Sequence, residues 1–119
     1  MMRGIGVMAA SALFITACAS VPAPTEQMTL SRAAVTEATN AGSSEYAPAQ
    51  LKTAMDKMGA AEQAMSEKKY VQARNLAEQA QVDAQLALAT ARAAKEKKAA
   101  DALHEDDRAL REEMNRNAK

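Results

Sequence analysis

The sequence has few aromatic residues, a single cysteine and no net charge. It contains no Trp, and its aromatic residues are Phe14, Tyr46 and Tyr70, which leaves few platforms on which bases or sugars could stack. Fifteen basic and fifteen acidic residues are interspersed, so nucleic-acid binding has no electrostatic support. One Cys cannot build a disulfide scaffold. The 119 residues, 48% hydrophobic and rich in Ala and Met, allow one small domain with a thin core.

Residues suited to catalysis are also scarce. Nucleophilic catalysis needs a Ser or Cys, a base and an orienting group that converge in a pocket. The only thiol lies near the N-terminus, at Cys18, and the only imidazole, that of His104, lies in a charged C-terminal segment. There is no glycine-rich phosphate loop. We therefore expect no enzyme and no cofactor.

Two weak patterns of metal-ligating residues have simpler explanations. The first is His104 with acidic residues three positions before and after it, Asp101 and Asp107. It lacks a second imidazole or thiolate, so we interpret it as a solvated charged face. The second is a set of thioethers that could hold copper(I), from Met55, Met58 and Met65. Methionine more often fills gaps between small core residues, so we predict no metal site.

The N-terminal residues 1–17 have the pattern of a signal peptide. Arg3 supplies a positive charge, and an uncharged, largely apolar run from Gly4 to Ile15 follows it. This run is too short to span a membrane. It ends in a sequence that resembles a bacterial lipobox, in which a branched apolar residue and two small ones precede the cysteine that is lipidated: Ile15, Thr16, Ala17 and Cys18.

Lipidation of Cys18 would hold the mature chain on a membrane. Three acyl chains bury far more CH₂ groups than the single chain that gives marginal binding. The alternative is an ordinary signal peptide with a chance cysteine, cleaved for instance after Ala19. By resemblance to the sorting of such lipoproteins, Ala19 after the cysteine indicates the outer membrane. We expect the covalent lipid to be the only attached group.

Residues 18–28 are expected to form a tether, because two prolines and small side chains favour an extended, semi-stiff chain. A first helix is predicted from Leu30 to Ala41, with Thr29 or Ser31 as its N-cap. A cluster of helix-breaking residues at 40–44 ends it.

Two further helices are predicted to form an antiparallel hairpin. Pro48 suits the first position of a helix that runs to Ser66, and the segment 67–69 is a short polar connection. Each helix carries apolar residues in steps of three and four, the spacing of a helix seam that faces a partner helix. In the second helix these residues are Leu51, Met58 and Met65. In the third they are Tyr70, Ala73, Ala77, Ala80, Ala84, Ala87 and Ala91.

A second stripe lies on another side of the third helix. Val82 and Leu86, followed by Ala89 and Ala93, repeat the same rhythm. Either the first helix covers these residues, or they stay exposed for a partner protein or a second copy.

From residue 95 onward the sequence is dense in charge. Opposite charges stand four residues apart, as in Asp107 with Arg111 and Arg108 with Glu112, which supports a helix in water. No Gly or Pro interrupts residues 70–119. The sequence therefore predicts an all-α fold, with an alanine-rich helical head at 29–94 and a charged helical arm at 95–119.

Two stretches of the head resemble a known family. The first is EYAP at 45–48, and the second is YxxARxLAEQAxxDAxLA at 70–87. Both are similar to the bacterial lipoprotein domain of unknown function 4398, over residues 21–94. The resemblance implies a lipid-anchored helical hairpin that faces the periplasm, and it supplies no catalytic residues. Some members carry a peptidoglycan-binding domain, for which residues 95–119 are too short.

Lys119 ends the chain, and Braun-type lipoproteins also end in a lysine, whose amine is linked to peptidoglycan. A covalent link at Lys119 is therefore one expectation, although the head is unlike a single Braun helix. We expect a non-enzymatic outer-membrane lipoprotein that acts as a structural or interaction module. Its partners would be an envelope protein or further copies of itself. The alternative is an adaptor that activates a periplasmic enzyme or transport complex.

Overall fold

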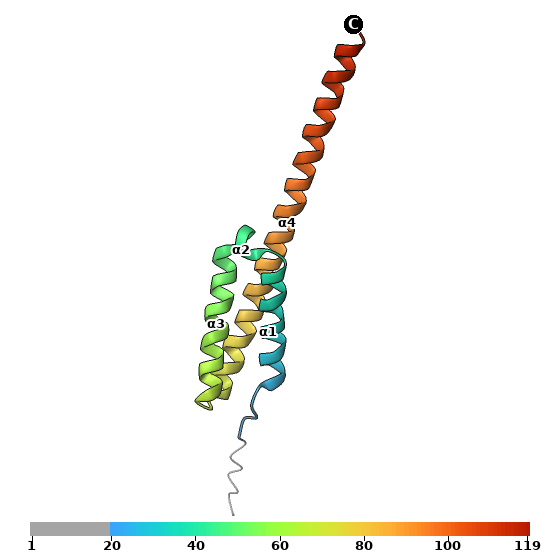
Figure 1. The fold of residues 1–119 in the computed structure, drawn as a ribbon. Helices are drawn as coiled ribbons and strands as arrows, with labels where there is room; N and C mark the ends of the chain where they lie inside the picture. Colours follow the sequence, from blue (N-terminus) through green and yellow to red (C-terminus); the bar gives the residue numbers. More distant parts are fainter. Residues whose placement is uncertain (1–19) are drawn as a thin grey trace, which may run out of the picture.

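The computed structural model describes residues 20–119, and these residues form helices without any strand. The helices are α1 (Thr25–Asn40), the short α2 (Ser43–Tyr46), α3 (Pro48–Ser66) and α4 (Tyr70–Asn117). At about 1.5 Å per residue, the 48 residues of α4 extend over roughly 72 Å. The predicted all-α fold, a small helical head with a long C-terminal helix, is confirmed (Figure 1).

The head consists of α1 and α3 packed side by side along the first half of α4 (Figure 1). Both helices pack mainly on α4 and touch each other less. The second half of α4 leaves the head and projects as an arm, and every residue from 95 to 119 is exposed. The N-terminal end of the described chain lies at the end of the head opposite the arm (Figure 1).

The first helix begins earlier than the sequence indicated. It starts at Thr25, so residues 25–28, which we assigned to the tether, are helical. The Met28 amide closes the first turn on the Pro24 carbonyl at 3.0 Å. Met28 is 5% exposed and packs into the core with methionine and alanine from the other helices. Burial of this side chain extends the helix beyond its expected start, because tertiary packing outweighs local propensity.

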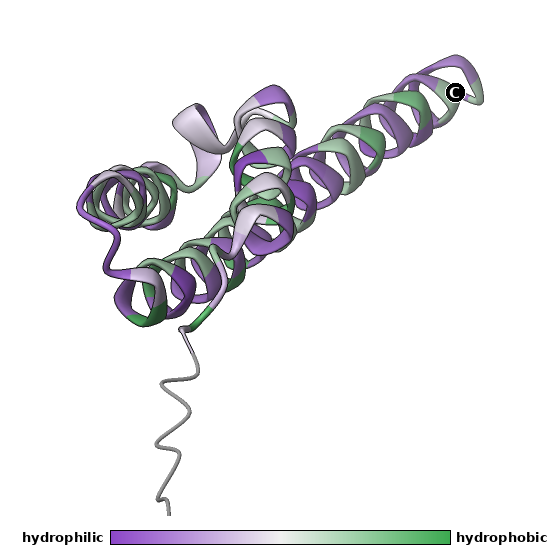
Figure 2. Ribbon diagram, turned by 90° about the horizontal axis from the view of Figure 1, so that it is seen from below, coloured by the Kyte–Doolittle hydropathy of each residue, from purple (hydrophilic) through white to green (hydrophobic). Residues whose placement is uncertain are grey.

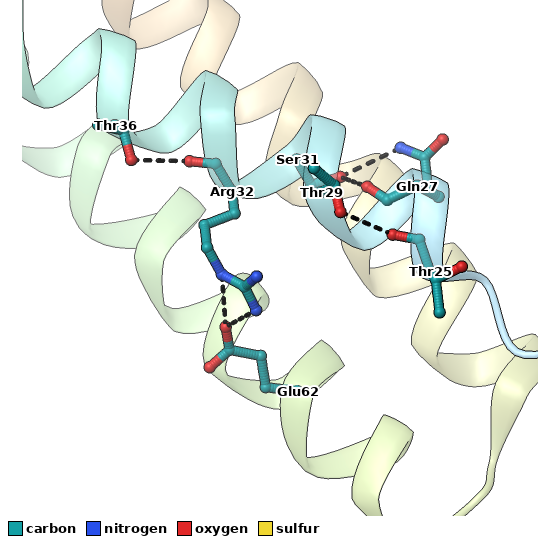
Figure 3. A network of polar contacts seen from close by, with 7 residues as sticks. All are labelled: Thr25, Gln27, Thr29, Ser31, Arg32, Thr36 and Glu62. Atoms are coloured by element: carbon teal, nitrogen blue, oxygen red, sulfur yellow. Dashed lines mark hydrogen bonds and ion pairs between the residues drawn. The ribbon is translucent and has the colours of Figure 1, made fainter.

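The two residues proposed as N-caps have other roles. Thr29 lies inside α1, and its hydroxyl donates to the Thr25 carbonyl at 2.9 Å (Figure 3). Ser31 is fully buried against α4. The helix has no side-chain cap at its N-terminus, where Pro24 occupies the N-cap position.

A short helix follows α1 where the sequence indicated only a break. Gly42 has a φ of 85°, a left-handed conformation that glycine adopts without steric cost. This turn leads into α2, whose Ser43 is buried. A Cβ at Gly42 would lie 3.1 Å from the Lys95 Nζ, so the turn also packs closely on α4.

The connection between α3 and α4 is a Schellman motif. The Lys68 amide donates to the Met65 carbonyl at 3.1 Å, and the Lys69 amide donates to the Ala64 carbonyl at 2.9 Å. Lys68 has a φ of 59°, a left-handed conformation that glycine usually provides. The motif reverses the chain and makes α3 and α4 antiparallel neighbours.

Candidate interaction surfaces

The alanine seam of α4 is the centre of the head. Its six alanines are fully buried: Ala73, Ala77, Ala80, Ala84, Ala87 and Ala91. Two core clusters follow one another along this seam, and each combines α4 alanines with residues of both α1 and α3. Because alanine extends only one carbon from the backbone, one seam can accommodate two neighbouring helices.

A buried hydroxyl shows how closely α1 approaches α4. The Ser31 Oγ lies 2.7 Å from the Ala77 carbonyl oxygen of α4 and 2.8 Å from the Gln27 carbonyl oxygen of its own helix. Its single proton can be donated to one of the two at a time. The side-chain amide of Gln27 donates to the same hydroxyl at 3.1 Å and to the side-chain oxygen of Gln81 in α4 at 2.7 Å. A side chain as short as serine bonds to a neighbouring backbone only where the helices pack tightly.

The other residues predicted for the helix interface lie at the same contact. Leu51 and Met58 of α3 are buried, and Met65 and Tyr70 are half-buried near the connection between α3 and α4. Met58 packs with alanines of α4. Met55, by contrast, is 53% exposed.

One ion pair connects each pair of the three long helices. Arg32 of α1 and Glu62 of α3 are 2.7 Å apart (Figure 3). Arg92 of α4 and Glu37 of α1 are 3.0 Å apart. The Lys57–Asp83 pair between α3 and α4, at 2.6 Å, is the most shielded from solvent. Exposed pairs contribute little to stability, so these contacts mainly favour one arrangement of the helices.

The arm begins at a contact that the sequence did not reveal. The Lys95 Nζ donates to the Ala41 carbonyl at 2.5 Å and lies 5.8 Å from the centre of the Tyr46 ring. The Lys98 Nζ lies 6.0 Å from the same ring. Both distances suit a cation–π interaction. The sequence shows a tyrosine, Tyr46, shortly after Gly42, and this could have indicated a contact site. Its partners Lys95 and Lys98 could not be predicted, because they are about fifty residues away in the sequence.

The outer stripe of α4 is uncovered. Val82 is 63% exposed and Leu86 is 53% exposed, and Ala89 and Ala93 are exposed as well. The first helix does not cover these residues, because it packs on the alanine seam instead. Of the two alternatives that the sequence left open for this stripe, the structure has the exposed one, because a single face of α4 contacts both α1 and α3. The exposed stripe is available for another molecule.

Within residues 20–119, the Glu67 carboxylate is the group whose pKa the structure shifts. A hydrogen bond from Lys69, with a second from Gln63, holds the pKa of Glu67 below its ordinary value. Glu67 is on the surface at the end of α3. This shift therefore accompanies the turn and does not indicate a reactive group.

The remaining candidate residues lie at the two ends of the chain. Ile15, Thr16, Ala17 and Cys18 fall outside the described residues, as does the predicted signal peptide. Lys119 is exposed at the tip of the arm. Within residues 20–119, no cluster of three or more His, Cys, Asp or Glu side chains could hold a metal ion. His104 is exposed on the arm.

An open apolar groove lies at the N-terminal end of the head. Its volume is about 810 Å³, and it is lined by residues that include Val21, Tyr70, Val71 and Leu76. Val71 is 57% exposed.

None of the helices formed by residues 20–119 is both long enough and apolar enough to cross a membrane.

Comparison with known proteins identifies the family. The model of a domain of unknown function, DUF4398, matches residues 26–103. The chain belongs to the DUF4398 family. A crystal structure of a DUF4398 family protein from Pseudomonas aeruginosa is 38% identical and superposes with a TM-score of 0.76. The superposed region covers 81% of this chain and 99% of the chain in that crystal structure. A search of curated proteins finds no significant match.

The DUF4398 match differs in extent from the resemblance seen in the sequence. We expected residues 21–94, whereas the family model ends at Leu103, inside the arm. The start of the arm is therefore part of the DUF4398 domain, and Lys95 and Lys98 contact the head there, at Ala41 and Tyr46.

Proposed function

We propose that this DUF4398 protein is a non-enzymatic lipoprotein of the bacterial outer membrane, which faces the periplasm and acts as a structural or interaction module. Lipid on Cys18 would anchor it. The observation that carries the proposal is the position of the two ends of the described chain. The described chain begins at one end of the head, where Ser20 lines a groove with Lys68 and Lys69, and the arm leaves from the other end (Figure 1).

This arrangement suits a module that presents a surface away from its anchor. With the N-terminus at a membrane, α4 would extend roughly 72 Å from the turn at Lys69 to Asn117. The centre of the head is filled by the alanine seam of α4 and its two core clusters. Support for an interaction role comes from the exposed apolar residues of α4.

The anchor is tested by metabolic labelling of the full chain with a fatty acid. Wild type should incorporate the label and fractionate with the outer membrane. Cys18→Ser should lose both properties, whereas a Ser20→Ala control should keep them. An unlabelled wild-type chain would exclude lipidation and leave the ordinary signal peptide as the explanation of residues 1–17.

The covalent link to peptidoglycan is tested at Lys119. Crosslinked cells are extracted in hot detergent, the wall is digested with muramidase, and attached peptides are identified by mass spectrometry. Muropeptides on the C-terminal peptide, absent in Lys119→Arg, would identify a wall tether. An unmodified Lys119 in wild type would exclude the tether but not the interaction role.

The adaptor role is the second candidate, and the exposure of Val82 and Leu86 favours it. Val82→Asp with Leu86→Asp should abolish crosslinking to one recurrent envelope protein while the head stays folded. Gln85→Asp, a change at an exposed neighbouring position, is the matched control. An unchanged crosslinking pattern in the double variant would exclude this face as an adaptor surface.

A further inference from the structure

The exposed stripe of α4 does not end with the head but continues along the whole arm. On the head it consists of Val82, Leu86, Ala89 and Ala93. The same alternation of four and three then gives positions 96, 100, 103, 107, 110 and 114. Leu103, Leu110 and Met114 are 69%, 57% and 63% exposed. Figure 2 shows hydrophobic segments recurring among hydrophilic ones along the arm.

This spacing is that of a coiled-coil seam. A repeat of 3.5 residues, sustained over 33 residues from 82 to 114, keeps one apolar line facing a partner helix. Eight of these ten positions are apolar, and the exceptions are Glu96 and Asp107. An isolated helix in water gains nothing from such a line, so the seam fits a second long helix with the same repeat. This chain carries one.

The two acidic residues select the direction of that second helix. In a parallel dimer in register, Glu96 would face Glu96 and Asp107 would face Asp107 across the seam, where like charges repel. In an antiparallel dimer that places Leu86 opposite Leu110, Glu96 faces Ala100 and Asp107 faces Ala89 instead. The antiparallel dimer therefore removes both like-charge pairs from the seam.

The charges beside the seam agree with the antiparallel arrangement. In that register Arg92 lies beside Asp106 of the second copy, and Asp83 lies beside Arg111, so opposite charges meet along both edges. Within one copy Arg92 also pairs with Glu37, Asp83 with Lys57 and Arg111 with Asp107. One pair of like charges remains, between Lys97 of one copy and Lys97 of the other. Within its own chain Lys97 is already paired with Asp101 at 2.7 Å. A parallel dimer in register would bring Arg92 beside Lys97, a pair of like charges, and Asp106 beside Arg111, a pair of opposite charges.

We propose that two copies of this chain associate antiparallel along the outer face of α4, so that the arm of each copy covers the exposed stripe on the head of the other. The interface is two-fold symmetric, and each copy contributes the same surface. The inference rests on the proposed interaction role and names its partner, a second copy of the chain. Two anchored copies would then lie along the membrane, with one anchor at each end of the dimer. It involves neither Cys18 nor Lys119, so its failure is distinguishable from a failure of the envelope anchor.

Disulfide mapping tests both the association and its direction. The full chain with Leu86→Cys and Leu110→Cys is purified in mild detergent, oxidised and digested, and its linkages are assigned by mass spectrometry. The expected product links position 86 of one copy to position 110 of the other. Positions 86 and 110 of one copy are about 36 Å apart along the helix, too far for an internal disulfide.

Each other outcome contradicts part of the proposal. Links of 86 to 86 and 110 to 110 would overturn the antiparallel direction in favour of a parallel dimer. An absence of links between these positions above those of wild type would overturn self-association through this face. Leu86→Cys with Ala109→Cys is the control, because position 109 lies off the seam and should give no link to 86. Any linkage through Cys18 appears in wild type and is recognised by its peptide.

Sedimentation of the full chain supplies a second measurement. Leu110→Asp should raise the dimer dissociation constant at least about tenfold, because it places a charge in the apolar seam. Ala109→Asp should change it by less than about threefold, because position 109 stays in water. Leu110 is already exposed in a single copy, so its substitution does not unfold the head, and circular dichroism verifies this. Equal effects of the two variants would overturn the assignment of Leu110 to the interface.

Discussion

Replacement of Ala84 by leucine should loosen the head more than any exposed change of the same kind. Ala84 is fully buried at the point where α1, α3 and α4 converge. Its cluster includes Ala38 from α1 and Ala54 from α3, both also fully buried. Three further carbons on α4 would meet both neighbouring helices at once, so neither helix could keep its place.

The expected cost follows from this lack of space. Inserting methylene groups into a well-packed core typically costs about 1–3 kcal/mol. Because both α1 and α3 must move, we expect about 2–3 kcal/mol for Ala84→Leu, which is a large part of the stability of a small domain. For a domain of this size, each kcal/mol lowers the melting temperature by roughly 4–8 °C. The melting temperature should therefore fall by roughly 8–24 °C.

Tyrosine fluorescence during urea titration is a suitable assay. The chain has no Trp, and its two tyrosines, Tyr46 and Tyr70, both lie in the head, so this signal reports the unfolding of the head. Ala102→Leu is the control, because it makes the same substitution on the exposed arm and should change stability by less than about 0.5 kcal/mol. If Ala84→Leu and Ala102→Leu have the same urea midpoint, the close packing of three helices on the alanine seam is refuted.

Three further changes test local features of the head by the same titration. Ser31→Ala should destabilise the head by about 1 kcal/mol, because it removes the hydrogen bond to the Ala77 carbonyl; a stability equal to wild type would show that this bond contributes nothing. Gly42→Ala should cost about 1–2 kcal/mol, because alanine disfavours a φ of 85° and its Cβ would crowd Lys95; an increase in stability would contradict the left-handed turn. Lys68→Gly should stabilise the head by roughly 0.5–1 kcal/mol, because glycine suits the left-handed position of the Schellman motif. A loss of stability in that variant would refute the strain at Lys68.

Much of the fold could be predicted because its signals are local. The expected bounds of α3, Pro48 to Ser66, are those of the structure, since a proline suits the first turn and a polar connection ends the helix. The long C-terminal helix followed from the absence of Gly and Pro after Tyr70. The arm pair Asp107–Arg111 forms at 2.8 Å, although Arg108 pairs with Glu105 and not with Glu112.

The features that the sequence did not predict share one cause, because each depends on contact between residues that are distant in the sequence. The start of α1 depends on Met28, whose burial requires α3 and α4 to be in place. The contact between Tyr46 and Lys95 joins residues about fifty positions apart. No pattern within one helix could indicate that α1 and α3 would share a single seam.

The sequence by itself determined which residues of this protein form helices and which face of α4 is apolar enough to be buried, because propensity and periodicity act over a few residues. Only the tertiary structure decided that α1 and α3 would both pack on the same stripe of α4. Alanine allows two helices to approach one face closely, and that arrangement left Val82 and Leu86 exposed. The choice depends on how three helices fill space together, and this is a property of no single segment.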